Sequence, residues 1–342
     1  MARSSHTRFL PLFLFLSVIS PTTTTAMITV AARGFLLEAT PLVVAMQDYY
    51  TASNGTFISD LPDLWQNRNV DLDAGAEVHV LHDAPGHADL RIVTTVAEVY
   101  YRIVANNASG TIHGPADLKG KRIGVVANTT SEYFAYRYLR DVAGLKDDEY
   151  TLVGASGGQG LCYSLPCGNG TLPKMLALGQ IDALTAYEPT TELAAMTIGE
   201  KNAVMFRNDS LYRELSVMYT TQAKLDDPVT RKEIVRFLKA LGKVQETFAT
   251  EPTKVWDRVA SITNRGMSVQ LLERIWGLTR WSGGLPADMV DLLAEEDEYI
   301  ARDKTLKRTA MTRERIASHI DSGPLAEVAN KLDEGVNLRG LR

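Results

Sequence analysis

Short apolar runs alternate with amphipathic stretches along the first two thirds of the chain. The apolar runs are rich in valine, isoleucine and alanine and are bounded by polar or glycine-containing turns, which is typical of strands. They cover residues 28–32, 90–95, 99–105, 123–127, 181–186 and 216–221. Stretches with a helical pattern follow several of them, at 41–50, 75–81, 132–144 and 173–178. This alternation predicts an α/β fold.

The last third of the chain is helical in pattern. Helices are predicted at 229–248, 252–263, 268–278, 287–301 and 313–320. The acidic run 295–298 is predicted to be a solvated helix face. Residues 51–75 are polar and rich in Asn and Asp, so we expect a loop there.

One strand, turn and helix start stand out at residues 116–131. The β-branched run 123–127 is the strand, and the small polar residues 128–131 follow it and can cap a helix that ends at Gly144. Backbone N–H groups and hydroxyls at the carboxyl end of a strand suit a small anionic or strongly polar ligand. The alternative is an ordinary capped helix without a ligand.

Residues 1–26 have the pattern of a secretory signal. Arg3 and Arg8 precede an apolar core at 9–19, and the stretch ends in the small residue Ala26. The core is short for a membrane span, so we expect a cleaved leader and a secreted protein, periplasmic if the producer is bacterial. The alternative is an uncleaved anchor.

Composition agrees with a secreted globular protein. With 45% hydrophobic and 23% charged residues the chain can bury a large core, and its length favours two lobes. The formal charge of −5 gives no electrostatic case for nucleic acid or an anionic membrane surface. We expect no stable membrane insertion after the leader, and a monomer.

The two cysteines and the glycosylation sequons fit an oxidising compartment. Cys162 and Cys167 lie in a Gly/Ser/Pro-rich loop, where a disulfide stapling a surface insertion is the simplest interpretation and two free thiols the alternative. Five Asn-x-Ser/Thr sequons favour a eukaryotic secretory route but leave a bacterial origin open. Glycans are expected at Asn54, Asn107, Asn169 and Asn208. The fifth sequon, at Asn128, lies on the proposed ligand turn and is expected to be unmodified.

Catalytic and metal-binding signatures are sparse. The sequence has no phosphate loop and no His-Glu-x-x-His helix. His79, His82 and His87 invite a metal interpretation, but no carboxylate cluster completes a site near them, so surface histidines are expected. We therefore predict neither a metal nor a cofactor, and an enzyme is the less favoured class.

Three runs carry a family resemblance. Residues 117–125, 178–183 and 187–189 resemble, in order and spacing, the signature runs of periplasmic solute-binding proteins of the nitrate, sulfonate and taurine type, a superfamily that also holds the thiamine-pyrimidine-precursor proteins. The similarity covers roughly residues 28–320. It implies a type II periplasmic binding fold, in which two α/β lobes are joined by two crossover strands.

The resemblance also implies domain boundaries. The chain divides into a signal peptide at 1–26, lobe 1 at 27–105 and 216–322, lobe 2 at 106–215, and a C-terminal tail at 323–342. Glu98, Tyr100 and Arg102 would flank the first crossing, where the arginine would either clamp a ligand or bridge to a carboxylate.

Ligand-binding residues are expected at the loops that face the cleft between the lobes. The candidates are Arg33, Glu38, Thr40, Gly75, Glu77, Asn128, Thr129, Thr130, Ser131, Tyr187 and Glu188. The polar residues of the turn 128–131 would donate hydrogen bonds, Glu77 and Glu188 would accept them, and Tyr187 would stack or hydrogen-bond. Arg33 would pair with an anionic group or stay a solvated strand-end charge, and Glu188 would meet a ligand or be a first-turn acid of a helix.

These expectations predict a protein that traps a small polar or anionic organic ligand by hinge closure. Sulfonate, nitrate, pyrimidine and carboxylate are the ligand classes, and a membrane ABC transporter is the partner if the producer is bacterial. Two other classes stay open: an enzyme on the same scaffold, and a secreted interaction protein with a vestigial cleft. The related thiamine-precursor synthases use a cysteine-rich iron motif and a lysine-bound pyridoxal phosphate, and this chain lacks the cysteine run.

Overall fold

The computed structural model describes residues 28–50, 55–59, 64–155, 157–263 and 265–333. The predicted leader and the sequon at Asn54 lie outside these residues. Among the helices of the described ranges, none is long and apolar enough to cross a membrane.

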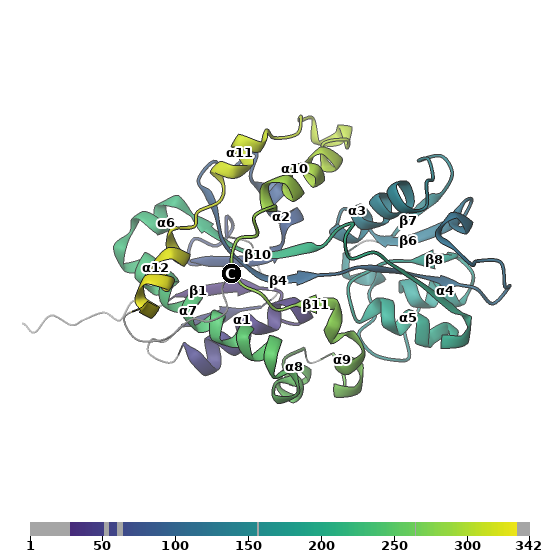
Figure 1. The fold of residues 1–342 in the computed structure, drawn as a ribbon, viewed down its shortest axis with the longest axis horizontal. Coiled ribbons are helices and arrows are strands. Elements are labelled where there is room, and N and C mark those ends of the chain that lie inside the picture. Colours follow the sequence, from purple (N-terminus) through teal and green to yellow (C-terminus); the bar gives the residue numbers. More distant parts are fainter. Residues whose placement is uncertain (1–27, 51–54, 60–63, 156, 264, 334–342) are drawn as a thin grey trace, which may run out of the picture.

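Two β-sheets organise the chain into two lobes that lie side by side (Figure 1). In order across lobe 1, the strands are β11 (Thr279–Arg280), β4 (Leu90–Val99), β10 (Glu214–Thr221), β3 (Leu72–Ala76), β1 (Thr29–Ala32) and β2 (Thr56–Ile58). Across lobe 2 they are β7 (Thr151–Ala155), β6 (Arg122–Val126), β8 (Ala183–Leu184), β5 (Arg102–Asn106) and β9 (Ala203–Arg207). The α/β fold with two lobes, predicted from the sequence, is confirmed.

The chain crosses between the lobes twice, first between β4 and β5 and again between β9 and β10. Strand β5, which the sequence analysis assigned to lobe 1, pairs with β8 and β9 in the sheet of lobe 2. The first crossing is therefore the short connection at Tyr100 and Tyr101. The second lies at residues 208–213, just before Glu214 opens β10.

Helices cover both faces of each sheet, because alternate strand residues are buried on opposite sides. In β1, Val30 packs into the core that holds α1 and α7, whereas Ala31 packs into the core that holds α2 and α10. Lobe 1 contains η1 (Leu37–Ala39), α1 (Thr40–Val44), η2 (Ala45–Tyr49), α2 (Glu77–Asp83), α6 (Gln222–Asp226), α7 (Pro228–Thr250), η7 (Pro252–Lys254), α8 (Trp256–Thr263), α9 (Val269–Ile275), η8 (Trp276–Leu278), α10 (Met289–Ile300), η9 (Lys304–Leu306), α11 (Arg313–Ser318) and α12 (Gly323–Asp333). Lobe 2 contains η3 (Pro115–Leu118), α3 (Thr130–Arg137), η4 (Tyr138–Val142), η5 (Gly157–Gly160), α4 (Leu172–Ala177), α5 (Thr190–Ile198) and η6 (Glu200–Asn202).

The predicted C-terminal helices are present, and α7 illustrates why. Asp227 caps the helix by accepting a hydrogen bond from the N–H of Thr230, and Pro228 occupies the first position, where a missing N–H costs nothing. Its apolar face, with Ile234, Phe237 and Leu241 at helical spacing, is buried in the core of lobe 1.

The structure corrects three expectations. The predicted loop 51–75 contains β2 and β3, because pairing with β1 and β10 stabilises strands that their composition does not favour. The segment 323–333, assigned to the tail, is helix α12, which packs on α7. The acidic run 295–298 is only partly solvated, since Glu296 and Asp297 are fully buried.

Gly124 on β6 leaves room for the side chains that cover the sheet of lobe 2. A methyl group there would lie 2.5 Å from Cδ1 of Ile181 and 2.8 Å from Cδ2 of Leu172. We expect Gly124→Ala to lower the free energy of unfolding by about 1–3 kcal/mol in urea denaturation, because the core must shift to admit it.

The matched control is the same change at Gly242, which is exposed inside α7 with no atom within 4 Å of the added carbon. Gly242→Ala is expected to raise the free energy of unfolding by up to about 1 kcal/mol, because alanine is the better helix former. Equal losses at both positions would contradict the packing argument.

Candidate functional site

A cavity of about 600 Å³ lies between the two lobes. Lobe 2 contributes residues from the start of α3 and from the segment before and within β7, and lobe 1 contributes residues from α2 and from the end of α10 and the segment after it. They are Asn128, Thr129, Glu132, Tyr133, Tyr136, Asp147, Tyr150 and Leu152 from lobe 2, and Val78, His82, Glu296, Tyr299, Ile300, Arg302, Asp303 and Leu306 from lobe 1. The cavity therefore has walls from both lobes, as a binding cleft requires.

The turn from β6 to α3 uses most of its hydroxyl groups locally. Thr129 caps α3: its Oγ1 accepts a hydrogen bond from the N–H of Ser131 and donates one to the carbonyl of Val126. The Oγ of Ser131 accepts a hydrogen bond from the N–H of Val126. Asn128 and Thr129 still line the cavity. The hydroxyls of Thr129 and Ser131 are therefore both used within the turn, as in an ordinary capped helix, although Asn128 and Thr129 border the cavity.

Four buried glutamates lie at the interface of the lobes: Glu38, Glu77, Glu214 and Glu296, hereafter the acid seam. Each is at most 9% exposed, and in the part of the chain that the structure describes none of them forms an ion pair with Arg, Lys or His. Because a buried, unpaired charge is costly, these carboxyls need hydrogen-bond donors or protons of their own.

Tyrosine and threonine hydroxyls supply the donors. Tyr101 and Thr130 both donate to Oε2 of Glu214, and the hydroxyls of Tyr101 and Thr130 are 2.7 Å apart. Tyr212 donates to Oε1 of Glu77 at 2.6 Å, and the N–H of Leu215 donates to Oε2 of Glu77. Thr130 therefore points into the lobe interface, unlike Ser131, and the donors come from both crossings and from α3.

The pKa values of the acid seam are all raised. Burial, with the nearby charge of Glu214, raises the pKa of Glu38 to about 8, and burial raises the pKa of Glu296 to about 8. Burial and the adjacent charges of Glu296 and Glu214 raise the pKa of Glu77 well above 4.5. Burial also raises the pKa of Glu214, although hydrogen bonds from Tyr101 and Thr130 oppose that shift. Burial therefore favours the protonated form of the carboxyl groups in the acid seam.

The other candidates from the first loops have mixed placements. Arg33 is exposed and forms no ion pair in the described ranges. Thr40 is buried and donates to the carbonyl of Leu37, so its hydroxyl is used within its own turn. Gly75 lies against the ring of His79, which a side chain at position 75 would approach to 3.2 Å.

Tyr187 and Glu188 end the strand region of β8 in lobe 2. The Tyr187 ring lies 6.1 Å from that of Tyr101, beside the acid seam. Glu188 accepts a hydrogen bond from Nε of Arg102 and another from the N–H of Glu192 in the first turn of α5. Arg102 therefore bridges to carboxylates, the second of the two roles considered for it. Glu188 acts as a first-turn acid of α5, which is likewise the second of its two roles.

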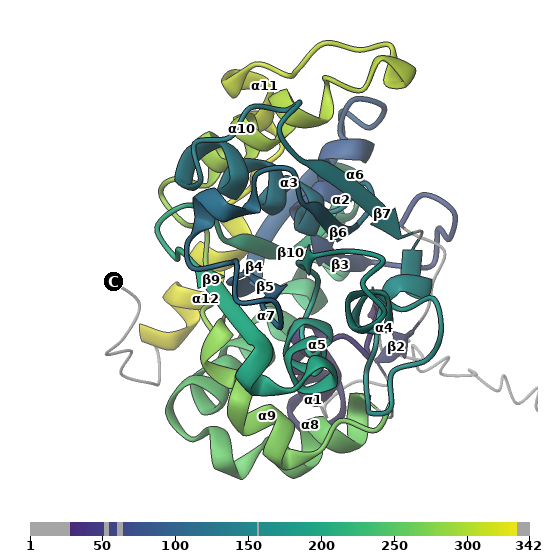
Figure 2. The same ribbon diagram turned by 90° about the vertical axis from the view of Figure 1, so that its right-hand side faces the viewer.

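Ion pairs join the lobes on opposite borders of the interface. On one border, Arg274 of α9 donates to Glu192 at 2.6 Å and to Glu200 at 2.7 Å. On the other, Arg137 of α3 pairs with Glu295 of α10 at 2.7 Å. Figure 2, viewed from the side of lobe 2, shows α10 and α9 on opposite sides of it. These contacts hold the lobes together without crossing the cavity.

The disulfide loop forms a further contact between the lobes. Cys162 and Cys167 form the predicted disulfide. Next to it, the Tyr163 ring meets the Phe35 ring of lobe 1 at 5.9 Å, and the Arg265 guanidinium lies 3.7 Å from Phe35 and 4.9 Å from Tyr163. The loop predicted to be a surface insertion therefore reaches across to lobe 1.

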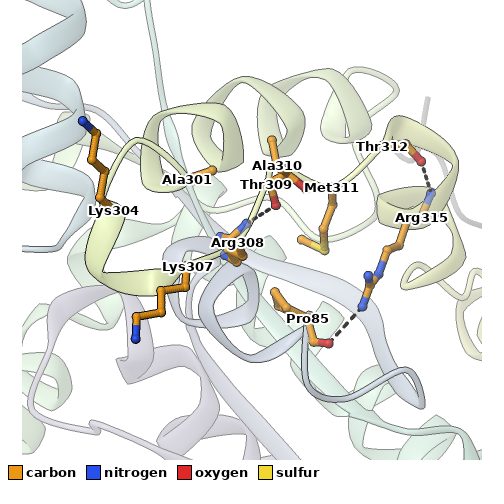
Figure 3. A pocket seen from close by; sticks show the side chains of 10 residues that line it. All are labelled: Pro85, Ala301, Lys304, Lys307, Arg308, Thr309, Ala310, Met311, Thr312 and Arg315. Carbon is orange, nitrogen blue, oxygen red and sulfur yellow. Dashed lines mark hydrogen bonds between the residues drawn. The ribbon is translucent and has the colours of Figure 1, made fainter.

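A larger cavity of about 910 Å³ lies within lobe 1, between Pro85 and the segment 301–315. Its basic side chains do not converge: Lys304 and Lys307 extend away from one another, and Arg315 reaches the carbonyl of Pro85 (Figure 3). Arg308 is already paired with the buried Asp297. This cavity has no wall from lobe 2 and is not the candidate site.

The histidines do not gather into a metal site. His82 lines the inter-lobe cavity, and the ring of His87 is stacked on that of Trp65 at 3.6 Å. Across the described segments, no group of three His, Cys, Asp or Glu side chains is arranged to hold a metal ion. Of the sequons within the described residues, Asn128 and Asn169 are exposed, whereas Asn107 and Asn208 are half-buried.

Sequence reasoning missed part of the site. Glu214 and Tyr101 were not identified because they lie at the crossings, where only the pairing of the lobes brings them to the turn 128–131. Glu296 was interpreted as solvated because its three neighbours in the sequence are also acidic. The aromatic side of the cavity was missed too, although Tyr133 and Tyr136 share a helix face at a spacing of three residues.

The acid seam predicts a stability that falls with rising pH. Between pH 4.5 and about 8 the folded protein keeps protons on Glu38 and Glu296 that the unfolded chain has released, so the free energy of unfolding decreases across this window. We expect the melting temperature to fall from pH 5 to pH 8. Glu38→Gln with Glu296→Gln should flatten this slope, whereas the exposed pair Glu246→Gln with Glu298→Gln should leave it unchanged.

The comparisons with known proteins fit this architecture. A family model described as NMT1/THI5 like matches residues 58–255. No curated protein matches significantly. Among solved structures, the periplasmic aliphatic sulphonate-binding protein SsuA of Escherichia coli is similar with a TM-score of 0.64 and 16% identity, over 84% of this chain and 96% of that chain.

Two further solved structures of differently named proteins are similar to this chain. The Candida albicans CA3427 gene product, described as having the generic periplasmic binding protein fold, gives a TM-score of 0.55 at 15% identity, over 87% of this chain and 96% of that chain. The desulfurization enzyme DszB is similar with a TM-score of 0.59 and 17% identity, over 89% of this chain and 99% of that chain. Identities this low establish the fold alone, but the family model covers more than half of the chain. The resemblance drawn from the sequence is thus confirmed, and the chain belongs to the NMT1/THI5-like family.

Proposed function

We propose that this protein is a secreted solute-binding protein that closes its two lobes over a small polar ligand. The observation that carries the proposal is the cavity of about 600 Å³ with walls from both lobes. The naming of the similar E. coli structure as a periplasmic aliphatic sulphonate-binding protein supports the same class. The leader pattern at residues 1–26 supports secretion.

The crossings would act as the hinge. Both crossings are short. Arg213, in the second crossing, donates hydrogen bonds to Glu98 near the end of β4 and to Asp288 before α10, which attaches this crossing to lobe 1 beside the first crossing. The lobes are otherwise joined by side-chain contacts, in the acid seam, across the cavity and at the borders. Rotation about the crossings would separate these contacts and open the cavity without unfolding either sheet. Closure would bring Asn128 and Thr129 of lobe 2 against α2 and α10 of lobe 1.

The expected partners follow from the proposed class of solute-binding proteins. In a bacterium the closed protein would deliver its ligand to a membrane ABC transporter, and in a eukaryote it would act as a carrier or scavenger. A monomer with one cleft is sufficient for either role. Glycans at Asn54, Asn107, Asn169 and Asn208 are compatible with the second route.

An enzyme on this scaffold is the second candidate, and one observation favours it. Glu214 is a buried carboxyl that accepts hydrogen bonds from two hydroxyl groups beside the cavity, an arrangement that could move a proton. The residues that line the cavity include no lysine for a Schiff base and no cysteine. The cofactor chemistry of the thiamine-precursor synthases therefore does not fit the described site.

A thermal-shift screen of the secreted protein tests the proposed function. The panel would hold nitrate, sulfonates, taurine, pyrimidines, amino acids, amines and carboxylates, and mass spectrometry would identify any molecule that co-purifies. A ligand that binds only the folded state raises the melting temperature with the logarithm of its concentration. Chemical turnover of such a ligand would favour the enzyme, and a flat response to every compound would favour an interaction protein.

Closure predicts a role for the ion pairs of Arg274. The variant Arg274→Gln removes the contacts from α9 to Glu192 and Glu200, so the ligand-free protein should open and its radius of gyration in small-angle scattering should rise. Binding of any ligand from the screen should weaken by about two- to fivefold, as expected for partly exposed pairs.

The matched control is Arg313→Gln, which breaks an exposed pair with Asp291 inside lobe 1. It should change neither the radius of gyration nor ligand binding. An unchanged radius for both variants would argue against these contacts as a latch.

A further inference from the structure

The inter-lobe cavity has an acidic lining. Four carboxyl groups line it, from helices α3 and α10 and from the segments before β7 and after α10: Glu132, Glu296, Asp147 and Asp303. The only guanidinium in the lining belongs to Arg302, which is exposed at the rim and lies 3.8 Å from Asp147. An anion entering this cavity would meet mostly like charge, whereas a cation would be attracted.

Aromatic rings form the rest of the wall. Tyr133 and Tyr136 of α3, Tyr150 before β7 and Tyr299 of α10 all line the cavity. The rings contact each other across the lobes, at 5.3 Å between Tyr133 and Tyr299 and 4.6 Å between Tyr136 and Tyr299. The electron-rich faces of tyrosine rings attract organic cations.

Guanidinium groups of the protein already lie beside these rings at the edge of the cavity, and those of Arg137 and Arg140 also donate hydrogen bonds to the hydroxyls of Tyr133 and Tyr136. The guanidinium groups of Arg302 and Arg140 lie 4.8 Å and 4.9 Å from the centre of the Tyr136 ring, and that of Arg137 lies 5.8 Å from the Tyr133 ring. Arg137 and Arg140 also pair with Asp141, outside the cavity. His82 is the one remaining titratable group of the lining.

Glu296 gives an independent sign of a missing partner. Its side chain is fully buried yet lines the cavity, and its Oε1 accepts no hydrogen bond from an N–H or hydroxyl group of the described residues. Its carboxyl shares a hydrogen bond with the carboxyl of Glu77, and its Oε2 makes a long contact of 3.4 Å to the hydroxyl of Tyr212. A buried acceptor left in this way costs free energy, which a donor on a bound ligand would recover.

We infer that the cavity binds a small organic cation, an ammonium or amidinium with a flat apolar body, whose charged N–H groups meet Glu296 and whose body lies among the tyrosine rings. This rests on the proposed solute-binding function and selects among its ligands. Among the ligand classes considered for this cavity, it favours an organic cation over the anionic sulfonate, nitrate and carboxylate classes. Glu132, Asp147 and Asp303 provide the surrounding negative field.

Three compounds of one shape test the charge. Benzamidine is a cation, benzamide is its neutral counterpart and benzenesulfonate is an anion on the same ring. Isothermal titration of the mature protein is expected to detect benzamidine with at least about tenfold higher affinity than benzamide, as for a hydrogen bond to a charged group, and no benzenesulfonate binding. Ionisation of Glu296 against the cation should release protons, so the measured heat should depend on the buffer, and affinity should rise from pH 5 to pH 8.

Glu296→Gln should remove the preference for benzamidine over benzamide while leaving the melting temperature near that of the parent, since a buried amide needs no counter-charge. Glu298→Gln is the matched control, because the same change falls on an exposed position of the same helix. If Glu296→Gln does not fold, Asp147→Asn replaces it: this exposed rim position should weaken benzamidine binding in a salt-dependent way and leave benzamide unaffected.

The outcomes separate this inference from the proposed function. Tighter binding of benzenesulfonate than of benzamidine, with lobe closure in small-angle scattering, would overturn the cation inference and leave the solute-binding function standing. Equal affinity for benzamidine and benzamide would overturn it as well. Absence of binding by all three would overturn it too, and the broad thermal-shift screen would then decide the solute-binding function on its own.

Discussion

Four carboxyl groups buried between two lobes without a cation are the constraint on which the rest of this structure depends. Removing a carboxylate from water is costly unless it gains hydrogen bonds, a counter-charge or a proton. Here the donors for Glu77 and Glu214 come from Tyr101 before β5, Thr130 of α3 and Tyr212 before β10. The chemistry of the carboxyls therefore ties lobe 1 to lobe 2 and to both crossings at once.

The contacts that hold the lobes together differ in kind between centre and border. The centre carries buried hydrogen bonds from hydroxyl to carboxyl groups, which are sensitive to geometry. The borders carry ion pairs such as Arg274 with Glu200 and Arg137 with Glu295, whose partners are partly exposed. Exposed pairs contribute little free energy each, so they can separate and re-form as the lobes move.

The same fold serves proteins that are named for different chemistry. SsuA is described as a sulphonate-binding protein and DszB as a desulfurization enzyme, and both share this two-lobed arrangement at less than 20% identity. Fold similarity at that level establishes the two-lobed arrangement and not what is bound. In this chain, acidic and tyrosine side chains from α3, α10 and the connecting segments make up half of the lining of the cavity between the lobes.

The sequence predicted the elements that local physics controls. Apolar periodicity located β1, β4 and β6, the helical pattern at 229–248 located α7, and the two cysteines in their loop predicted the disulfide. The family runs added the arrangement of two lobes joined by two crossings. Each of these signals lies within a few neighbouring residues, so no knowledge of distant contacts is needed to detect it.

The strands β2 and β3, the burial of Glu296 and the identity of the cavity walls were decided only by the tertiary structure. β3 consists of a leucine, an aspartate and three small residues, and it becomes a strand because β1 and β10 pair with it on both sides. Glu296 lies in an acidic run that is typical of a solvated face, and it is buried where α10 lies against Glu77 of α2 and Tyr212 of the second crossing. Whether an acid is solvated or buried depends on which other surface covers it, and that surface lies far away in the sequence.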